Sequence, residues 1–93
     1  MTYTFTAKVE LFERDKGWHY VLVPSELSKP HEHLADRGLI AVTANIGNSS
    51  WQTSLLPMGD GTHFIALPVK IRAKEKLSRG EDVKVSFALR ERK

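Results

Sequence analysis

The sequence predicts an all-β fold, namely a small, closed or nearly closed barrel of six strands with one short helix between the second and third strands. Three observations lead to this prediction: short runs in which apolar and polar residues alternate, turn-forming residues between these runs, and a single helical interruption. The middle of the chain is strongly apolar, and closure of the sheet removes the strand edges that it would otherwise expose.

The length and composition indicate one domain. The chain has 93 residues, of which 41% are hydrophobic, so residues 1–93 are expected to share a single core. The absence of cysteine excludes disulfides, a catalytic thiolate and thiolate ligands for zinc. No apolar run approaches the roughly 20 residues that a membrane-spanning helix needs, and the opening residues MTYTF lack the pattern of a signal peptide. We therefore expect a soluble, cytoplasmic protein that does not contact a membrane.

The first two strands are expected to pair antiparallel. Every second residue from Tyr3 to Leu11 is apolar and polar residues lie between them, which predicts a long strand with one inward face. A charged turn, ERDKG, follows. The run Trp18 to Val23 is rich in strand-forming residues, and Pro24 ends it because proline cannot donate to the ladder.

The next stretch, Ser25 to Arg37, predicts one short helix. Its two leucines are seven positions apart and mostly polar residues separate them. Pro30 is tolerated only in a first turn, so the helix is expected to begin near Ser28 after a single loose turn. Gly38 stands where a helix C-cap requires a positive φ.

The remaining chain predicts four more strands. Leu39 to Ile46 has little polar face, which suits a strand covered on both sides. Residues 51–56 and 63–69 flank the turn sequence PMGDG and form the clearest hairpin of the chain. Residues 70–77 either continue the fifth strand or leave the sheet, and residues 82–89 alternate as the sixth. Four aromatic residues of the predicted strands are expected to supply the core: Trp18, Trp51, Phe64 and Phe87.

The net charge of +3 is unevenly distributed. Residues 1–69 hold five Lys or Arg and seven Asp or Glu, which gives −2, whereas residues 70–93 hold nine and four, which gives +5. Such asymmetry can indicate an acidic or nucleic-acid partner. The alternative is a solvated strand face followed by a basic terminus.

Four cations recur at every second position from Lys70 to Lys76, so an extended chain would project all of them from one face. We interpret the protein as a non-catalytic module that binds a small polar or anionic ligand, or a partner domain, where this segment and the turns meet at the barrel mouth. No cofactor is expected. The predicted ligand-binding residues are Lys70, Arg72, Lys74, Asn48 and Trp51.

Other functions are weaker alternatives. A single-stranded nucleic-acid binder would use the cations together with an aromatic platform such as Trp51. An enzyme would need His63 beside a serine, with Asp60 completing a triad, but Asp60 suits the Asp-Gly turn better, so no catalytic residue is assigned. His31 and His33 would point to different sides of a helix, and no metal site is expected.

One family resemblance covers nearly the whole chain. It rests on the strand from Trp18 to Pro24, the turn Ile46-Gly47-Asn48, the block LPMGDGTH at 56–63 and the ending GEDVKV at 80–85. These residues resemble the bacterial family DUF1905, a domain of unknown function. The resemblance implies a six-stranded closed Greek-key barrel, sometimes found beside or fused to a domain of the bacteriocin-protection type, and implies no activity. Two departures from the family pattern are the order Gly47-Asn48 and the extra Glu81 before Asp82.

Overall fold

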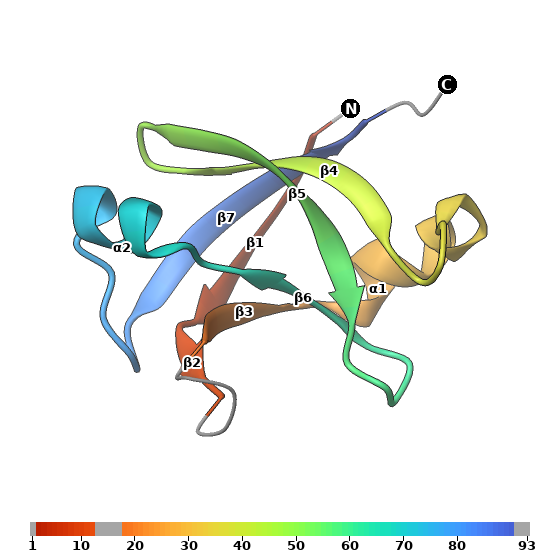
Figure 1. Ribbon diagram of the computed structural model, residues 1–93, viewed down its shortest axis with the longest axis horizontal. Helices are drawn as coiled ribbons and strands as arrows, with labels where there is room; N and C mark the ends of the chain where they lie inside the picture. Colours follow the sequence, from red (N-terminus) through yellow and green to blue (C-terminus); the bar gives the residue numbers. More distant parts are fainter. Residues whose placement is uncertain (1, 13–17, 91–93) are drawn as a thin grey trace.

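The computed structural model describes residues 2–12 and 18–90. In this part of the chain seven strands form one sheet in the order β1-β7-β4-β5-β6-β3-β2, and all neighbouring strands are antiparallel (Figure 1). The strands are β1 (Thr2–Lys8), β2 (Glu10–Leu11), β3 (His19–Val23), β4 (Ile40–Ile46), β5 (Ser49–Pro57), β6 (His63–Ala66) and β7 (Asp82–Leu89). The helices are α1 (Ser25–Ser28), the 3-10 helix η2 (Lys29–Leu34) and α2 (Val69–Glu75).

The sheet curls into a nearly closed barrel because its two edge strands, β1 and β2, are consecutive in the chain. β1 pairs with β7 and β2 pairs with β3, and only Val9 separates β1 from β2. Val9 donates its N–H to the carbonyl of Glu81 at 2.8 Å and accepts the N–H of Gly80 at 2.8 Å. The all-β barrel is therefore confirmed, although the predicted first strand is divided at Val9 and the strand count is seven rather than six. The Greek-key connectivity stays a prediction.

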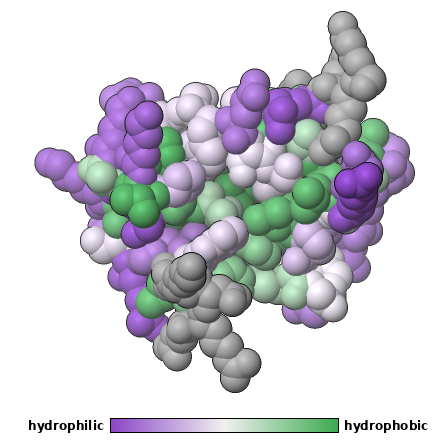
Figure 2. All heavy atoms as spheres, in the orientation of Figure 1, coloured by the Kyte–Doolittle hydropathy of each residue, from purple (hydrophilic) through white to green (hydrophobic). Residues whose placement is uncertain are grey.

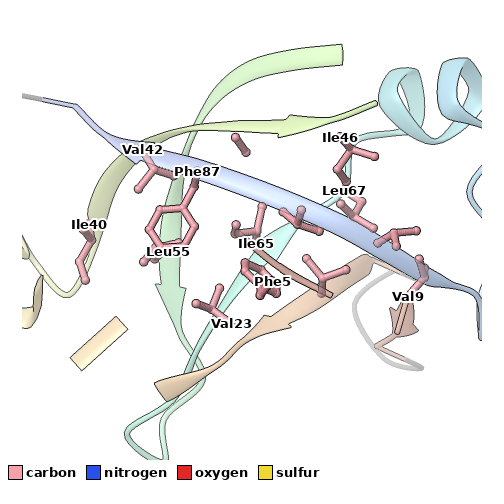
Figure 3. Close-up of a cluster of buried hydrophobic side chains, with 14 residues drawn as sticks. Phe5, Val9, Val23, Ile40, Val42, Ile46, Leu55, Ile65, Leu67 and Phe87 are labelled. Carbon is pink, nitrogen blue, oxygen red and sulfur yellow. The ribbon is translucent and has the colours of Figure 1, made fainter. Parts of the chain in front are cut away.

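The core fills the inside of the barrel and follows the alternation of the sequence. Inward-facing side chains of β1, β3, β4, β5, β6 and β7 meet there, as the close-up in Figure 3 shows. The buried cluster consists of Phe5, Val9, Val21, Val23, Ile40, Val42, Ala44, Ile46, Leu55, Ile65, Leu67, Val83, Val85 and Phe87. Removing this apolar surface from water is the main source of stability, at about 25 cal/mol per Å².

Aromatic residues also lie outside the barrel. Phe64 and Tyr20 are on the outer faces of β6 and β3, because the residues next to them in sequence, such as Ile65 and Val21, face the core. Phe12 stacks on Tyr20 with ring centroids 4.1 Å apart. In Figure 2, hydrophobic residues gather on the face formed by β3, β5 and β6. Phe64 is nevertheless buried, by its aromatic neighbours on the outside rather than by the core.

Short helices cover the two ends of the barrel. α1 and η2 follow the end of β3, and α2 follows the end of β6, which is antiparallel to β3, so the helices lie at opposite ends (Figure 1). The helical region begins at Ser25, earlier than predicted, while Ser28 and Pro30 do begin the second helix. Gly38 does not cap that helix. It has φ +83° in the tight turn between Asp36 and Leu39, which exchange two backbone hydrogen bonds.

The two hairpins have defined registers. In the β5–β6 hairpin, which the sequence predicts, Pro57 lies opposite His63. In the β4–β5 hairpin, Ile46 lies opposite Ser49, so Gly47 and Asn48 form a two-residue turn. Gly47 has φ +56° and Asn48 has no positive φ, as in a type II′ turn. The order Gly-Asn therefore selects this turn, whereas Asn-Gly selects type I′.

Candidate functional site

The basic segment, residues 70–76, forms most of α2 instead of extending the fifth strand. Residues two apart point to different sides of a helix, because each residue advances about 100° around the axis. Lys70 and Lys74 therefore lie on one flank and Arg72 on the other, while Lys76 follows the helix in the left-handed conformation. Ile71, between the two flanks, is buried. The four cations therefore do not form the single row expected of an extended chain.

A pocket of about 400 Å³ opens beside the start of α2. Residues at the start of β3, the end of β6 and the start of α2 line it. We call it the Arg72 pocket, and its lining residues are Trp18, His19, Ala66, Leu67, Pro68, Val69 and Arg72. Of the ligand-binding residues predicted from the sequence, Arg72 is the one that contributes to this wall.

Two hydrogen bonds position Arg72. Its Nε donates to the carbonyl oxygen of Leu67 at 3.0 Å. The backbone N–H of Leu67 in turn donates to the carbonyl oxygen of His19 at 2.9 Å, which joins the end of β6 to the start of β3. The half-buried guanidinium is thus held against the barrel end. Since Nε is engaged, the two Nη groups are the donors that Arg72 presents to a ligand.

Two further features of the pocket come from β3 and the residue before it. The Trp18 side chain is 52% exposed at the pocket, which corrects the expectation that this residue supplies the core. Nδ1 of His19 is buried and has no hydrogen-bond partner among the described residues. Because this atom is shielded from solvent, it faces the protein interior and not the open pocket.

The other predicted binding residues lie elsewhere. Lys70 and Lys74 are exposed on the flank of α2 that faces away from Arg72, and Asn48 is exposed in the β4–β5 turn. Trp51 lies opposite the buried Ala44 and packs against the core, so its ring is not a free stacking platform. The structure therefore separates the predicted set into four places, and their roles in binding stay predictions.

A second hollow, of about 340 Å³, lies on the outer face of β1, β7, β4 and β5. It has no charged lining residue; the lining consists of Thr2, Thr43, Asn45, Ser50, Ser86, Phe87 and Ala88. Part of its polar lining already bonds within the protein: Ser50 donates to Asn45 Oδ1 at 3.2 Å, and Asn45 Nδ2 donates to the Gly47 carbonyl at 3.3 Å. It offers a ligand less unused hydrogen-bonding capacity than the Arg72 pocket does.

The residues considered for catalysis do not come together as a triad. Asp60 Oδ1 accepts the backbone N–H of Thr62 at 3.0 Å and also its hydroxyl, and these bonds lower the pKa of the Asp60 carboxyl. Ser49 donates to Glu75 at 2.6 Å. His63 faces inward at the α1 end of the barrel, opposite Pro57 and Val23. Within residues 2–12 and 18–90, no three His, Asp or Glu side chains come together as metal ligands do.

These features define a small all-β barrel domain with short helices across its ends and a cationic pocket at one of them. The family model described as domain of unknown function (DUF1905) matches residues 5–87, and the chain belongs to this family. No curated protein matches the chain. None of the helices in the described part of the chain has the length and apolar character needed to cross a bilayer.

The sequence contains only a weak signal for the residues that complete the pocket. Trp18 follows a charged turn and begins a strand, and an aromatic residue at a strand start is compatible with both core and rim positions. His19 and Leu67 contribute to the pocket through backbone hydrogen bonds as well as through their side chains. A backbone hydrogen bond does not depend on residue type, so the sequence does not indicate it. The proximity of Trp18 to Arg72 follows from the pairing of β3 with β6.

Proposed function

We propose that this domain is a non-catalytic binding module whose Arg72 pocket takes a small anionic ligand with a flat ring. The observation that carries the proposal is the convergence, at one pocket, of a guanidinium fixed by the Leu67 carbonyl and a half-exposed indole, that of Trp18. The absence of cysteine in the chain supports a reducing compartment, and we propose the cytoplasm as its location.

The anionic part of the ligand binds Arg72. The two Nη groups form a planar fork that matches two oxygens of a carboxylate or a phosphate, and such charge-assisted pairs are stronger than neutral hydrogen bonds. Because the bond to Leu67 already restricts the Arg72 side chain, less conformational entropy is lost when the ligand binds.

The ring of the ligand packs against the apolar part of the pocket. Trp18 presents an aromatic face, and Pro68 and the exposed Val69 extend the apolar surface. Stacked aromatic pairs contribute about 0.5 to 1.5 kcal/mol beyond the area that they bury. The pocket volume of about 400 Å³ falls within the range of small-ligand sites.

Titration with phenyl phosphate, benzoate and inorganic phosphate, followed by NMR, tests the proposal. We expect the signals of the Trp18 indole N–H and the Arg72 Nε–H to shift, and phenyl phosphate to bind more tightly than inorganic phosphate because only the former has a ring. Arg72→Gln is expected to weaken phenyl phosphate binding about tenfold, the loss of about 1.4 kcal/mol.

Lys74→Gln is the matched control, because it removes one positive charge from the same helix but on the other flank. It is expected to change the affinity for phenyl phosphate by less than about twofold, because an exposed charge contributes little. Equal effects of Arg72→Gln and Lys74→Gln, or no shift of the Trp18 signal with any of the three compounds, would contradict the proposal.

A further inference from the structure

We infer that the ligand of the Arg72 pocket is one nucleotide of a single-stranded nucleic acid, with its base on Trp18, its phosphate on Arg72 and the next phosphate on Lys76. The inference rests on the proposed function of the pocket and adds the class of partner. It starts from the end of α2, where a second cation, Lys76, follows Arg72 by four residues.

Arg72 and Lys76 are four residues apart, and Lys76 directly follows the last residue of α2. A rise of 1.5 Å per residue separates them by about 6 Å along the helix axis, which is comparable with the spacing of successive phosphates in an extended strand. Lys76 is exposed and ends the helix in the left-handed conformation, with φ 55°. The N–H of Leu77 donates to the Arg72 carbonyl at 2.9 Å, which fixes this end of the backbone relative to Arg72.

The charges of the segment that begins at the pocket and runs to residue 81 favour a polyanion. Residues 70–81 contain five Lys or Arg and two Glu, a net charge of +3. Both glutamates are held by hydrogen bonds: Glu75 accepts the Ser49 hydroxyl, and Glu81 accepts the Ser78 N–H at 2.8 Å. One phosphate needs only Arg72, so the exposed cation at the end of the same helix favours a ligand with repeated phosphates.

The exposed indole distinguishes a nucleic acid from other polyanions. An acidic peptide supplies repeated charge but no flat ring for each charge, whereas each nucleotide supplies both. Base–aromatic stacking contributes about 1 to 3 kcal/mol per base. Trp18 stands at the pocket that contains Arg72, so a base and its own phosphate reach the two side chains together.

The experiment compares labelled oligothymidylate and oligouridylate of about eight nucleotides, within the usual site size of small barrels, with thymidine monophosphate and phenyl phosphate. We expect the oligonucleotides to bind at least about tenfold more tightly than the monophosphate at low salt, and to quench the Trp18 fluorescence, read in a Trp51→Phe background. Tighter binding of oligothymidylate would indicate a DNA ligand, and tighter binding of oligouridylate would indicate an RNA ligand. Either result supports the inference.

The salt dependence tests the role of Lys76. For single strands the slope of log affinity against log salt changes by about 0.7 for each phosphate contact. Lys76→Gln is therefore expected to reduce the slope by about 0.7 and to leave the affinity for phenyl phosphate unchanged. Lys74→Gln, with the same charge change on the other flank, is expected to reduce the slope much less, and Lys29→Gln, at the opposite barrel end, not at all.

Failure of the inference is distinguishable from failure of the proposed function. If phenyl phosphate binds at Arg72 but the oligonucleotides bind no more tightly than the monophosphate, the inference is wrong and the proposed function stands. If no phosphate compound binds, both are wrong. An oligoglutamate that binds as tightly as the oligonucleotides, or equal slope changes for Lys76→Gln and Lys74→Gln, also overturns the inference.

Discussion

The hydroxyl of Ser49 donates a hydrogen bond of 2.6 Å to Oε2 of Glu75, and this bond ties the C-terminal end of α2 to the start of β5. α2 is also anchored from its middle, where Arg72 Nε donates to the carbonyl of Leu67, two residues before the helix. The helix that carries the candidate binding residues is thus attached to the barrel at two points, and the position of Arg72 in the pocket depends on both.

A double-mutant cycle at Ser49 and Glu75 measures the first attachment. Hydrogen bonds to charged groups contribute about 1.5 to 3 kcal/mol, and partial exposure reduces this figure. We expect Ser49→Ala and Glu75→Gln each to lower the free energy of unfolding by about 1 kcal/mol, with the double variant little worse than either. Urea denaturation gives all four values. Additive losses would show that the bond contributes nothing of its own.

Gly47 is expected to tolerate a side chain only when Glu75 moves. A Cβ at this position would clash with Oε1 of Glu75, so Gly47→Ala displaces the carboxylate from Ser49. The positive φ of 56° adds a further cost that does not depend on Glu75. We therefore expect Gly47→Ala to destabilise the protein by about 1 kcal/mol more in the natural sequence than in a Glu75→Ala background. Equal losses in the two backgrounds would refute the contact.

Arg90 is expected to stabilise the β7–β4–β5 part of the barrel. Its Nε donates to the Val42 carbonyl at 3.0 Å and one Nη donates to the Thr53 carbonyl at 2.9 Å, so one side chain reaches two strands. We expect Arg90→Gln to lower the free energy of unfolding by about 1 to 3 kcal/mol. Lys84→Gln on the exposed face of β7 serves as the control, with a change below about 0.5 kcal/mol. A comparable loss in the control would assign the effect to net charge.

Two leucine truncations test the burial pattern of the barrel. Leu55 is fully buried in the core, whereas Leu22 is 42% exposed on the outer face of β3. We expect Leu55→Ala to cost about 2 to 5 kcal/mol, because it removes buried methyl groups and leaves a cavity. Leu22→Ala is expected to cost less than about 1 kcal/mol. Thermal and urea unfolding measure both, and a larger loss for Leu22→Ala would mean that the inward and outward faces are assigned wrongly.

The raised pKa of Tyr20 leads us to expect that the protein loses stability at high pH. Burial raises the pKa of the Tyr20 phenol above its ordinary value of 10.0, and the negative charge of Glu10, opposite it on β2, raises the pKa further. The folded protein therefore binds the phenol proton more tightly than the unfolded chain does. The resulting stability is present below about pH 10 and is lost as the pH rises through the raised pKa.

The phenolate absorbance of a Tyr3→Phe variant measures this titration, because Tyr20 is then the remaining tyrosine. We expect its midpoint to lie above that of the urea-unfolded protein, and Glu10→Gln to move it down by the smaller, electrostatic part of the shift. A midpoint that is the same in folded and unfolded protein would contradict the burial of Tyr20.

Much of the barrel follows from local patterns. The alternation in residues 3–11 and 82–89 predicts inward and outward faces correctly, because a strand turns each successive side chain to the opposite side of the sheet. The hairpin around PMGDG is predicted for a similar reason: its glycines adopt the positive φ values that a chain reversal requires. The family resemblance, which rests partly on this block, is confirmed over residues 5–87.

The basic segment shows the limit of such patterns. Cations at every second position are compatible with the exposed face of a strand and with the two flanks of a helix, because lysine and arginine tolerate solvent in both. The contacts with the barrel decide between them: Ile71 enters the core region and Glu75, one turn later, bonds to Ser49. The sequence alone does not show which part of the barrel these two residues pack against.

The sequence by itself determined the class of the fold, the alternating faces of most strands, the clearest hairpin and the concentration of positive charge near the C-terminus. Tertiary structure alone decided that residues 69–75 are helical, that Trp18 is exposed and that it shares a pocket with Arg72. The physical reason is the distance along the chain over which each interaction acts. Strand alternation and turn geometry depend on neighbours in the chain, whereas the pocket exists because antiparallel pairing brings the start of β3 to the end of β6.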